Sequence, residues 1–116
     1  MTTRWQDIYK TLKQSGFNVF SPGQHKGDCL ENYVVVKQDG EISVSGFSSN
    51  AVYYKLLCYF PQNSYSSSEI FIQNIKQAMK SLYPMVTYTN QQDPPFFDEG
   101  VKGWMIALRY KNHVKN

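Results

Sequence analysis

The chain has 116 residues, which suits a single domain spanning residues 1–116 around one hydrophobic core. Its net charge of +3 is spread along the sequence, without the concentrated basic stripe or the motif of a nucleic-acid-binding protein. No apolar run reaches membrane-spanning length, no secretory signal is visible, and the two cysteines form no CxxC pair. We therefore expect a cytoplasmic protein with reduced thiols.

The first predicted element is a helix over about residues 3–15, because apolar side chains recur there at helical spacing. Thr2 or Thr3 is expected to cap its start, and Gly16 stands where a left-handed C-terminal cap belongs. The apolar face consists of Trp5, Ile8, Tyr9 and Leu12.

A short extended piece, a turn and a polar surface loop are expected over residues 17–32. The β-branched run 33–37 predicts a strand. Asp39-Gly40 follows it and predicts a type I′ hairpin turn, after which Ile42 and Val44 begin a second strand. A further turn is expected over residues 46–50.

The longest predicted strand runs over residues 51–60 and ends at Pro61. Both of its faces are largely apolar, so it is expected to be central, with both sides covered. A second helix follows, in which Ser66 and Glu69 have the spacing of a capping box and Pro84 stops the helix. Its apolar stripe is Phe71, Ile75, Ala78, Met79 and Leu82, flanked by Ile72.

The last part of the chain is predicted to contain a short strand over 85–89, a long loop over 90–100 and a strand over 101–111. Trp104, Ile106, Leu108 and Tyr110 of that strand are expected to face the core. The densest basic group, which we interpret as a solvated C-terminal tail, is Arg109, Lys111, His113 and Lys115. The predicted fold is α+β, with one mainly antiparallel sheet, two helices packed on it, and the order α-β-β-β-α-β-β.

No catalytic constellation is recognisable among the nucleophiles and bases of the chain. Cys58 alternates with core residues and is predicted to be a buried structural thiol. Cys29 and His25 have i, i+4 spacing, but neighbouring glycines oppose the helix that would bring them together as metal ligands. We therefore expect no catalytic residue, no metal site and no cofactor.

Apolar residues outside the predicted core indicate an interaction surface. Phe96 and Phe97 are carried on a loop that Pro94 and Pro95 stiffen, and a rigid loop lowers the entropy cost of docking. Met105 and Ala107 lie on the side of the last strand that faces away from the core. These six residues are the predicted subunit or partner contact. The alternatives are that the loop folds back onto the core and that a helix of the same chain covers Met105 and Ala107.

Five segments and a final strand form a recognisable pattern that covers essentially the whole chain. They are Ile8–Leu12, Val19–Cys29, Tyr33–Lys37, Leu57–Pro61, Pro94–Asp98 and the strand ending in Arg109-Tyr110. The pattern resembles small proteins encoded at the head–tail junction of long-tailed bacteriophages and of prophages of Gram-positive bacteria. These proteins are often labelled minor capsid proteins and look like tail terminators, also called tail-completion proteins.

The resemblance implies a mixed α/β subunit that forms a ring, commonly six-fold, on the end of the tail tube. Such a ring stops tube growth and docks to the head connector, so the implied partners are copies of itself, the tail tube protein and the connector. DNA only passes through the ring, and no membrane is involved. The implied location is the host cytoplasm during assembly and then the virion.

Two other classes of function remain open from the sequence. One is a monomeric adaptor or inhibitor domain that binds a single cellular protein. The other is a small enzyme that uses Cys29 and His25, which requires a reactive thiol at neutral pH.

Overall fold

Three long strands, β2 (Tyr33–Ser43), β3 (Ser49–Pro61) and β6 (Gly103–Lys115), form the centre of one sheet. The computed structural model describes the backbone of residues 4–43 and 49–115 and the side chains of residues 4–40 and 51–112. The six-stranded sheet has the order β1-β2-β3-β6-β4, and β5 also pairs with β6. The other elements are α1 (Trp5–Gln14), β1 (Val19–Phe20), the 3-10 helix η1 (Gln62–Ser67), α2 (Ser68–Met79), the 3-10 helix η2 (Lys80–Leu82), β4 (Thr87–Gln92) and β5 (Phe96–Asp98).

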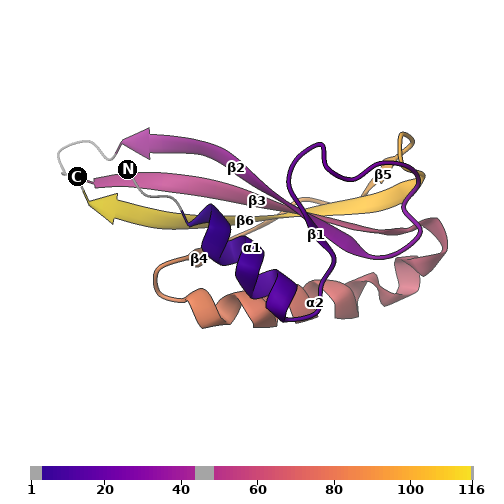
Figure 1. Cartoon of the computed structure of the whole chain (residues 1–116), viewed down its shortest axis with the longest axis horizontal. Helices are drawn as coiled ribbons and strands as arrows, with labels where there is room; N and C mark the ends of the chain where they lie inside the picture. The colour runs from indigo at the N-terminus through magenta and orange to yellow at the C-terminus, as the bar shows by residue number, and fades with distance from the viewer. Residues whose placement is uncertain (1–3, 44–48, 116) are drawn as a thin grey trace.

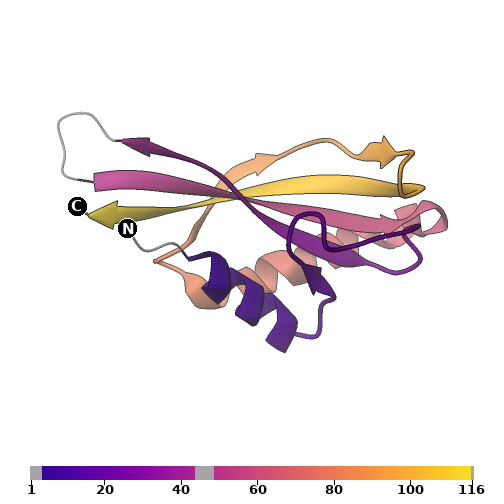
Figure 2. The same ribbon diagram turned by 45° about the horizontal axis from the view of Figure 1, so that its top comes forward.

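Both helices lie on the same face of the sheet, beneath β2, β3 and β6 (Figure 1). Only β1 runs parallel to its neighbour, so the α+β fold with a mainly antiparallel sheet is confirmed. The molecule is elongated, with extents of 48 × 25 × 24 Å, and the strands β2, β3 and β6 extend beyond the helices at the left of Figure 1. The edge of the sheet opposite β2 is formed by β4 and β5, which follow one another along β6 (Figure 2).

The predicted helical stripes form the core. Ile8 and Leu12 of α1 are fully buried, and the α2 stripe is buried with Ala78 half-exposed. Gly16 has φ +95°, and the amides of Gly16 and Phe17 donate to the carbonyls of Lys13 and Leu12. These two bonds are those of a Schellman cap, so the predicted glycine cap is confirmed.

The structure confirms neither of the two predicted N-terminal helix caps. Arg4 is the N-cap of α1, without a side-chain cap bond, while Thr2 and Thr3 lie outside the described residues. The predicted capping box of α2 is wrong. The cap position is Ser67, whose hydroxyl donates to the Ser64 carbonyl within η1 instead of satisfying the helix amides.

Asp39-Gly40 is not a hairpin turn, and that prediction is wrong. β2 continues through it, since Gln38 pairs with Tyr54 and Glu41 with Val52, so three residue steps on β2 face two on β3. This extra residue is a β-bulge. Gly40 in the bulge has a φ of +99°, a conformation that glycine adopts at low cost and other residues rarely adopt. The predicted Val44 strand position and the 46–48 part of the predicted turn lie outside the described residues, while Ser49 and Asn50 belong to β3.

β3 is central and ends at Pro61 as predicted, but the expectation that both of its faces are covered is wrong. The alternate residues from Val52 to Phe60 are buried under the helices, whereas Tyr53, Lys55, Leu57 and Tyr59 on the other face are half-exposed. Part of that outer face is covered by the 21–32 loop, which forms a second, smaller cluster. It contains Cys29, Tyr33 and Val35, with Phe20, Leu57, Tyr59 and Val101 packed against them.

Two predictions about the last part of the chain are also wrong. The 90–100 segment is not one long loop, because residues 90–92 belong to β4 and residues 96–98 form β5 on β6. The basic C-terminal group is not a tail, because β6 continues to Lys115 and pairs with β3 along its length.

Candidate interaction site

A row of large side chains crosses the sheet on the face away from the helices. Tyr33 pairs with Tyr59, Tyr59 with Met105, and Met105 with Phe96. Exposure changes strongly along this row: Tyr33 lies beneath the 21–32 loop with 4% of its surface accessible, and Phe96 at the edge has 58%. The row therefore ends in the phenyl group of Phe96, which is exposed to solvent.

The β5 segment is held rigidly from its other face. Phe97 points to the helix side, where its ring packs against Trp104 at 5.3 Å with an interplanar angle of 71°. Trp104 in turn contacts Tyr65 of η1 at 5.0 Å. Pro94 and Pro95, both exposed, precede β5. We call residues 94–99 the β5 tip, and its anchoring means that Phe96 is presented on a fixed support.

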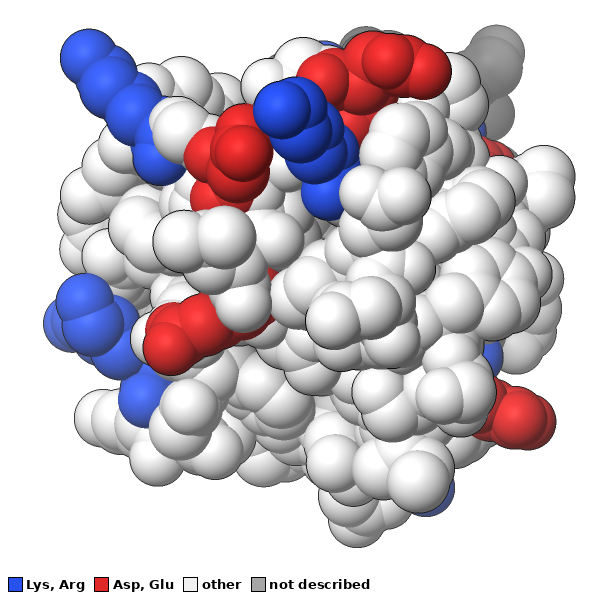
Figure 3. All heavy atoms as spheres, turned by 90° about the vertical axis from the view of Figure 1, so that its right-hand side faces the viewer, with Lys and Arg blue, Asp and Glu red and all other residues white. Residues whose placement is uncertain are grey.

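Part of the end of the molecule that carries the β5 tip is uncharged. Figure 3 views this end, where charged side chains gather along the upper and left parts and most of the remaining surface is uncharged. From Leu56 to Ser68 the sequence has no charged residue, and η1 lies within this run. Low charge is typical of the buried centre of a protein interface.

The six predicted contact residues are only partly brought together. Pro94, Pro95 and Phe96 are exposed, and Phe97 and Met105 are half-buried. Ala107 has 1% of its surface accessible, so its prediction as an exposed contact residue is wrong. The Asp93 amide donates to the Ala107 carbonyl at 3.0 Å, which shows that the β4–β5 connection lies against this part of β6.

An ion-pair cluster on the outer face holds the residue that precedes the β5 tip. The Arg109 guanidinium contacts Asp39 at 3.2 Å and Asp93 at 3.2 Å, and Lys55 lies 3.9 Å from Asp39. Each pair is partly exposed and is worth about 1 kcal/mol or less. The main effect of the cluster is positional, because the Arg109 side chain links the β2 bulge to Asp93, the residue before Pro94.

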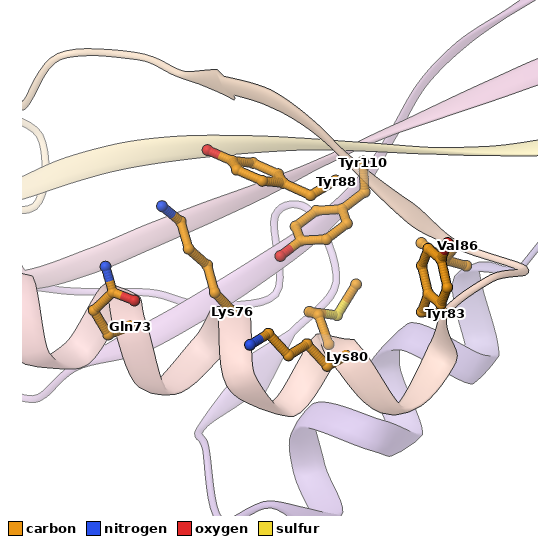
Figure 4. Close-up of a pocket in the computed structure, with 8 residues that line it drawn as sticks. Gln73, Lys76, Lys80, Tyr83, Val86, Tyr88 and Tyr110 are labelled. Carbon is orange, nitrogen blue, oxygen red and sulfur yellow. The ribbon is translucent and has the colours of Figure 1, made fainter.

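A groove between α2 and β4 is the second feature of the site, and sequence reasoning missed it. It has a volume of about 470 Å³. Met79, Val86 and the rings of Tyr83, Tyr88 and Tyr110 form its apolar lining. Lys76 of α2 and Lys80, the first residue of η2, project beside it (Figure 4). The sequence carries no signal for it, because only the structure shows that apolar residues after α2 are exposed, with Tyr83 at 71% and Met85 at 48%.

The ionisable groups around the groove are of one sign. The Lys76 ammonium donates to the Gln92 side-chain oxygen at 3.0 Å and lies 5.0 Å from the centre of the Tyr88 ring. Burial raises the pKa of Tyr110 above its usual range, so its hydroxyl stays neutral. The lining residues include two lysines and no carboxylate.

Cys29 and His25 are both held in packing contacts of the 21–32 loop. Cys29 is buried, and desolvation raises the pKa of its thiol to about 11. The His25 ring stacks on Tyr33 with centroids 3.9 Å apart. Within the described ranges 4–43 and 49–115, no group of three His, Cys, Asp or Glu residues could hold a metal ion. The geometry thus favours packing roles for both residues.

We expect Cys29 to react slowly with iodoacetamide at pH 7.5. At a pH below the pKa, the thiolate fraction falls tenfold for each unit by which the pKa rises. The rise in the Cys29 pKa from 9.0 to about 11 therefore lowers the thiolate fraction by about a hundredfold relative to the unfolded chain. Mass spectrometry of native and urea-unfolded protein measures both rates. The native rate should rise as the pH approaches 11. Rapid native labelling of Cys29 at neutral pH would instead support the enzyme alternative.

Comparison with known proteins found no matching family model and no curated protein with a significant sequence match. No helix in the described part of the chain is long and apolar enough to cross a membrane.

Proposed function

We propose that this protein is a virion assembly component of the tail-terminator or head–tail joining type, whose copies form a ring. The observation that carries the proposal is the rigidly supported, 58% exposed Phe96 on an edge strand of the sheet. The segment that was predicted to be a contact loop is itself part of the sheet edge, so an apolar contact residue and an open strand edge coincide.

The β5 edge is suited to burial by another protein surface. Phe97 and Trp104 already hold β5 in place, so docking costs little additional conformational entropy. A second, different edge lies across the sheet, because β1 pairs only with Val34 and Val35 of β2 among the described residues. A subunit with unlike contact surfaces can join its copies head to tail, and such contacts close into a ring when the rotation permits.

The proposed partners are copies of this chain, the tail tube protein and the head connector. The ring, six-fold by the resemblance, would cap the tail tube and let DNA pass without binding it specifically. It would assemble in the host cytoplasm and remain at the head–tail junction of the virion. No cofactor and no catalytic step belong to this proposal.

Replacing Phe96 with serine should abolish assembly into rings of subunits. It should change the melting temperature little, because the phenyl group of Phe96 is mainly exposed in the single subunit. Size-exclusion chromatography with light scattering, together with negative-stain microscopy, measures ring formation in concentrated protein. Leu30→Ser is the matched control, since Leu30 is 81% exposed in another segment and should leave the rings intact. Phe97→Ser is less informative, because loss of the Trp104 contact should also lower stability.

Two results would contradict the proposal. A wild-type protein that stays monomeric at every accessible concentration would favour the adaptor or inhibitor alternative. Rings that persist in the folded Phe96→Ser variant would show that the β5 tip is not the contact.

A further inference from the structure

The groove between α2 and β4 is apolar inside and positively charged at its rim. Lys76 and Lys80 stand one helical turn apart, so both reach the same side of the groove. From Ile70 to Gln92 the sequence contains these two lysines and no acidic residue. A segment that fills the groove should therefore combine a large apolar side chain with about two carboxylates, because charge complementarity selects partners and disfavours like-charged ones.

The β5 tip has this combination of side chains. Phe96 pairs with Met105 and Asp98 with Gly103, so both tip residues project from the same face of β5, away from the helices. Glu99 follows and is exposed. Asp98-Glu99 is the only pair of adjacent acidic residues in the sequence, and it lies next to an exposed aromatic ring.

We propose that the groove between α2 and β4 binds the β5 tip of a second copy of this chain, with Phe96 on the apolar floor and Asp98 and Glu99 beside Lys76 and Lys80. The inference rests on the proposed function and names the surface that receives the tip. Two aromatic walls, Tyr88 and Tyr110, would contact the phenyl ring, and aromatic pairs of this kind add to the burial of apolar area.

The tip and the groove lie apart on the subunit. In Figure 1, β5 lies at the right-hand end, whereas the C-terminal end of α2 lies toward the left. Contact between two unlike surfaces is heterologous, so repetition of the contact generates a chain of subunits, which closes as a ring where the rotation between subunits permits. The contact thus supplies the head-to-tail geometry that a ring needs.

A rival segment lies beside Val101, to whose carbonyl the Cys29 amide donates. Leu30 is 81% exposed and is flanked by the exposed residues Asp28 and Glu31. It has the charge and the apolar side chain that the groove requires, although the 28–31 segment is not a strand of the sheet. The rival therefore provides a comparison variant with the same change in charge.

The test uses charge reversal on both sides of the contact in the full chain. Lys76→Glu with Lys80→Glu, and separately Asp98→Lys with Glu99→Lys, should each weaken self-association by about a hundredfold, since each tenfold corresponds to about 1.4 kcal/mol and like charges now face one another. An equimolar mixture of the two variants should recover association, because each then offers one complementary surface to the other. Analytical ultracentrifugation over a concentration series measures the effect.

Three controls keep the result interpretable. Lys10→Glu with Lys13→Glu makes the same charge change on exposed positions of α1 and should leave association unchanged. Circular dichroism checks the fold of each variant, and Lys80→Glu alone, at an exposed position, replaces the double change if that variant does not fold. Asp28→Lys with Glu31→Lys should neither disrupt assembly nor restore it when mixed with the groove variant.

The outcomes separate this inference from the proposed function. Rings that survive reversal at the groove or at the tip would overturn the groove contact and leave the ring proposal standing. Restoration by the 28–31 variant in place of the tip variant would also overturn the contact. A closed dimer that both reversals disrupt would support the contact and contradict the ring. A wild-type monomer at all concentrations would overturn both.

Discussion

Phe60→Ala should lower the free energy of unfolding by about 4 kcal/mol, because truncation of a fully buried phenylalanine removes apolar burial and leaves a cavity. Phe60 has no accessible surface and lies near the end of β3, next to the strand-ending Pro61. Its ring is 6.1 Å from that of Tyr65, so the truncation also removes a support of the aromatic stack that holds the β5 tip. Such a loss is a large part of the about 5–15 kcal/mol that stabilises a typical domain.

Urea unfolding monitored by tryptophan fluorescence measures this loss, with an unchanged slope showing that the change lies in stability. Leu30→Ala is the control, because its side chain is 81% exposed and its truncation should cost less than about 0.5 kcal/mol. A loss below about 2 kcal/mol for Phe60→Ala would contradict the described core. Ring formation should also weaken in this variant, to an extent that follows the loosening of the tip.

Gly103→Val should destabilise the fold by about 3 kcal/mol through overpacking. A β-carbon at this position would lie 2.7 Å from the Cys29 β-carbon and 3.1 Å from both the Cys29 sulfur and the Phe60 carbonyl oxygen. The carbonyl belongs to the backbone of β3 and cannot move away without disturbing the sheet. The other neighbour, Cys29, is held by a hydrogen bond from its amide to the Val101 carbonyl. Glycine at 103 is therefore required for the 21–32 loop to dock on the outer face.

A double-mutant cycle tests this explanation. The cost of Gly103→Val should be smaller in a Cys29→Gly background, since the closest contact is then absent, while the contact with the Phe60 carbonyl keeps the rescue partial. Gly100→Val is the control, because a β-carbon there meets only the flexible Asp98 side chain, at 3.2 Å, and should cost less than about 1 kcal/mol. Equal costs in both backgrounds would show that Cys29 is not the source of the strain.

Hydrophobic periodicity was sufficient for the main elements. The stripes of α1 and α2 and the core-facing side of β6 were all predicted, because each depends only on residue spacing within one segment. The glycine cap after α1 was predictable for the same reason, since the cap is completed by bonds within a few residues.

Pairing between distant segments determined which parts of the chain are turns, bulges or edge strands, which the local sequence pattern leaves open. Asp39-Gly40 suits both a tight turn and a bulge, and only the register of β2 on β3 selects the bulge. The 90–98 segment has the polar and proline-rich composition of a loop, yet parts of it pair with the edge of β6 and belong to β4 and β5.

The candidate contact shows the same division. Proline stiffening and the Phe96-Phe97 pair indicated the tip, but only the cross-strand register separates the exposed Phe96 from the anchored Phe97 and buries Ala107. The groove has no sequence signature of its own. Its lining comes from α2, the 80–86 segment, β4 and β6, so only the packing of these elements exposes an apolar surface beside two lysines.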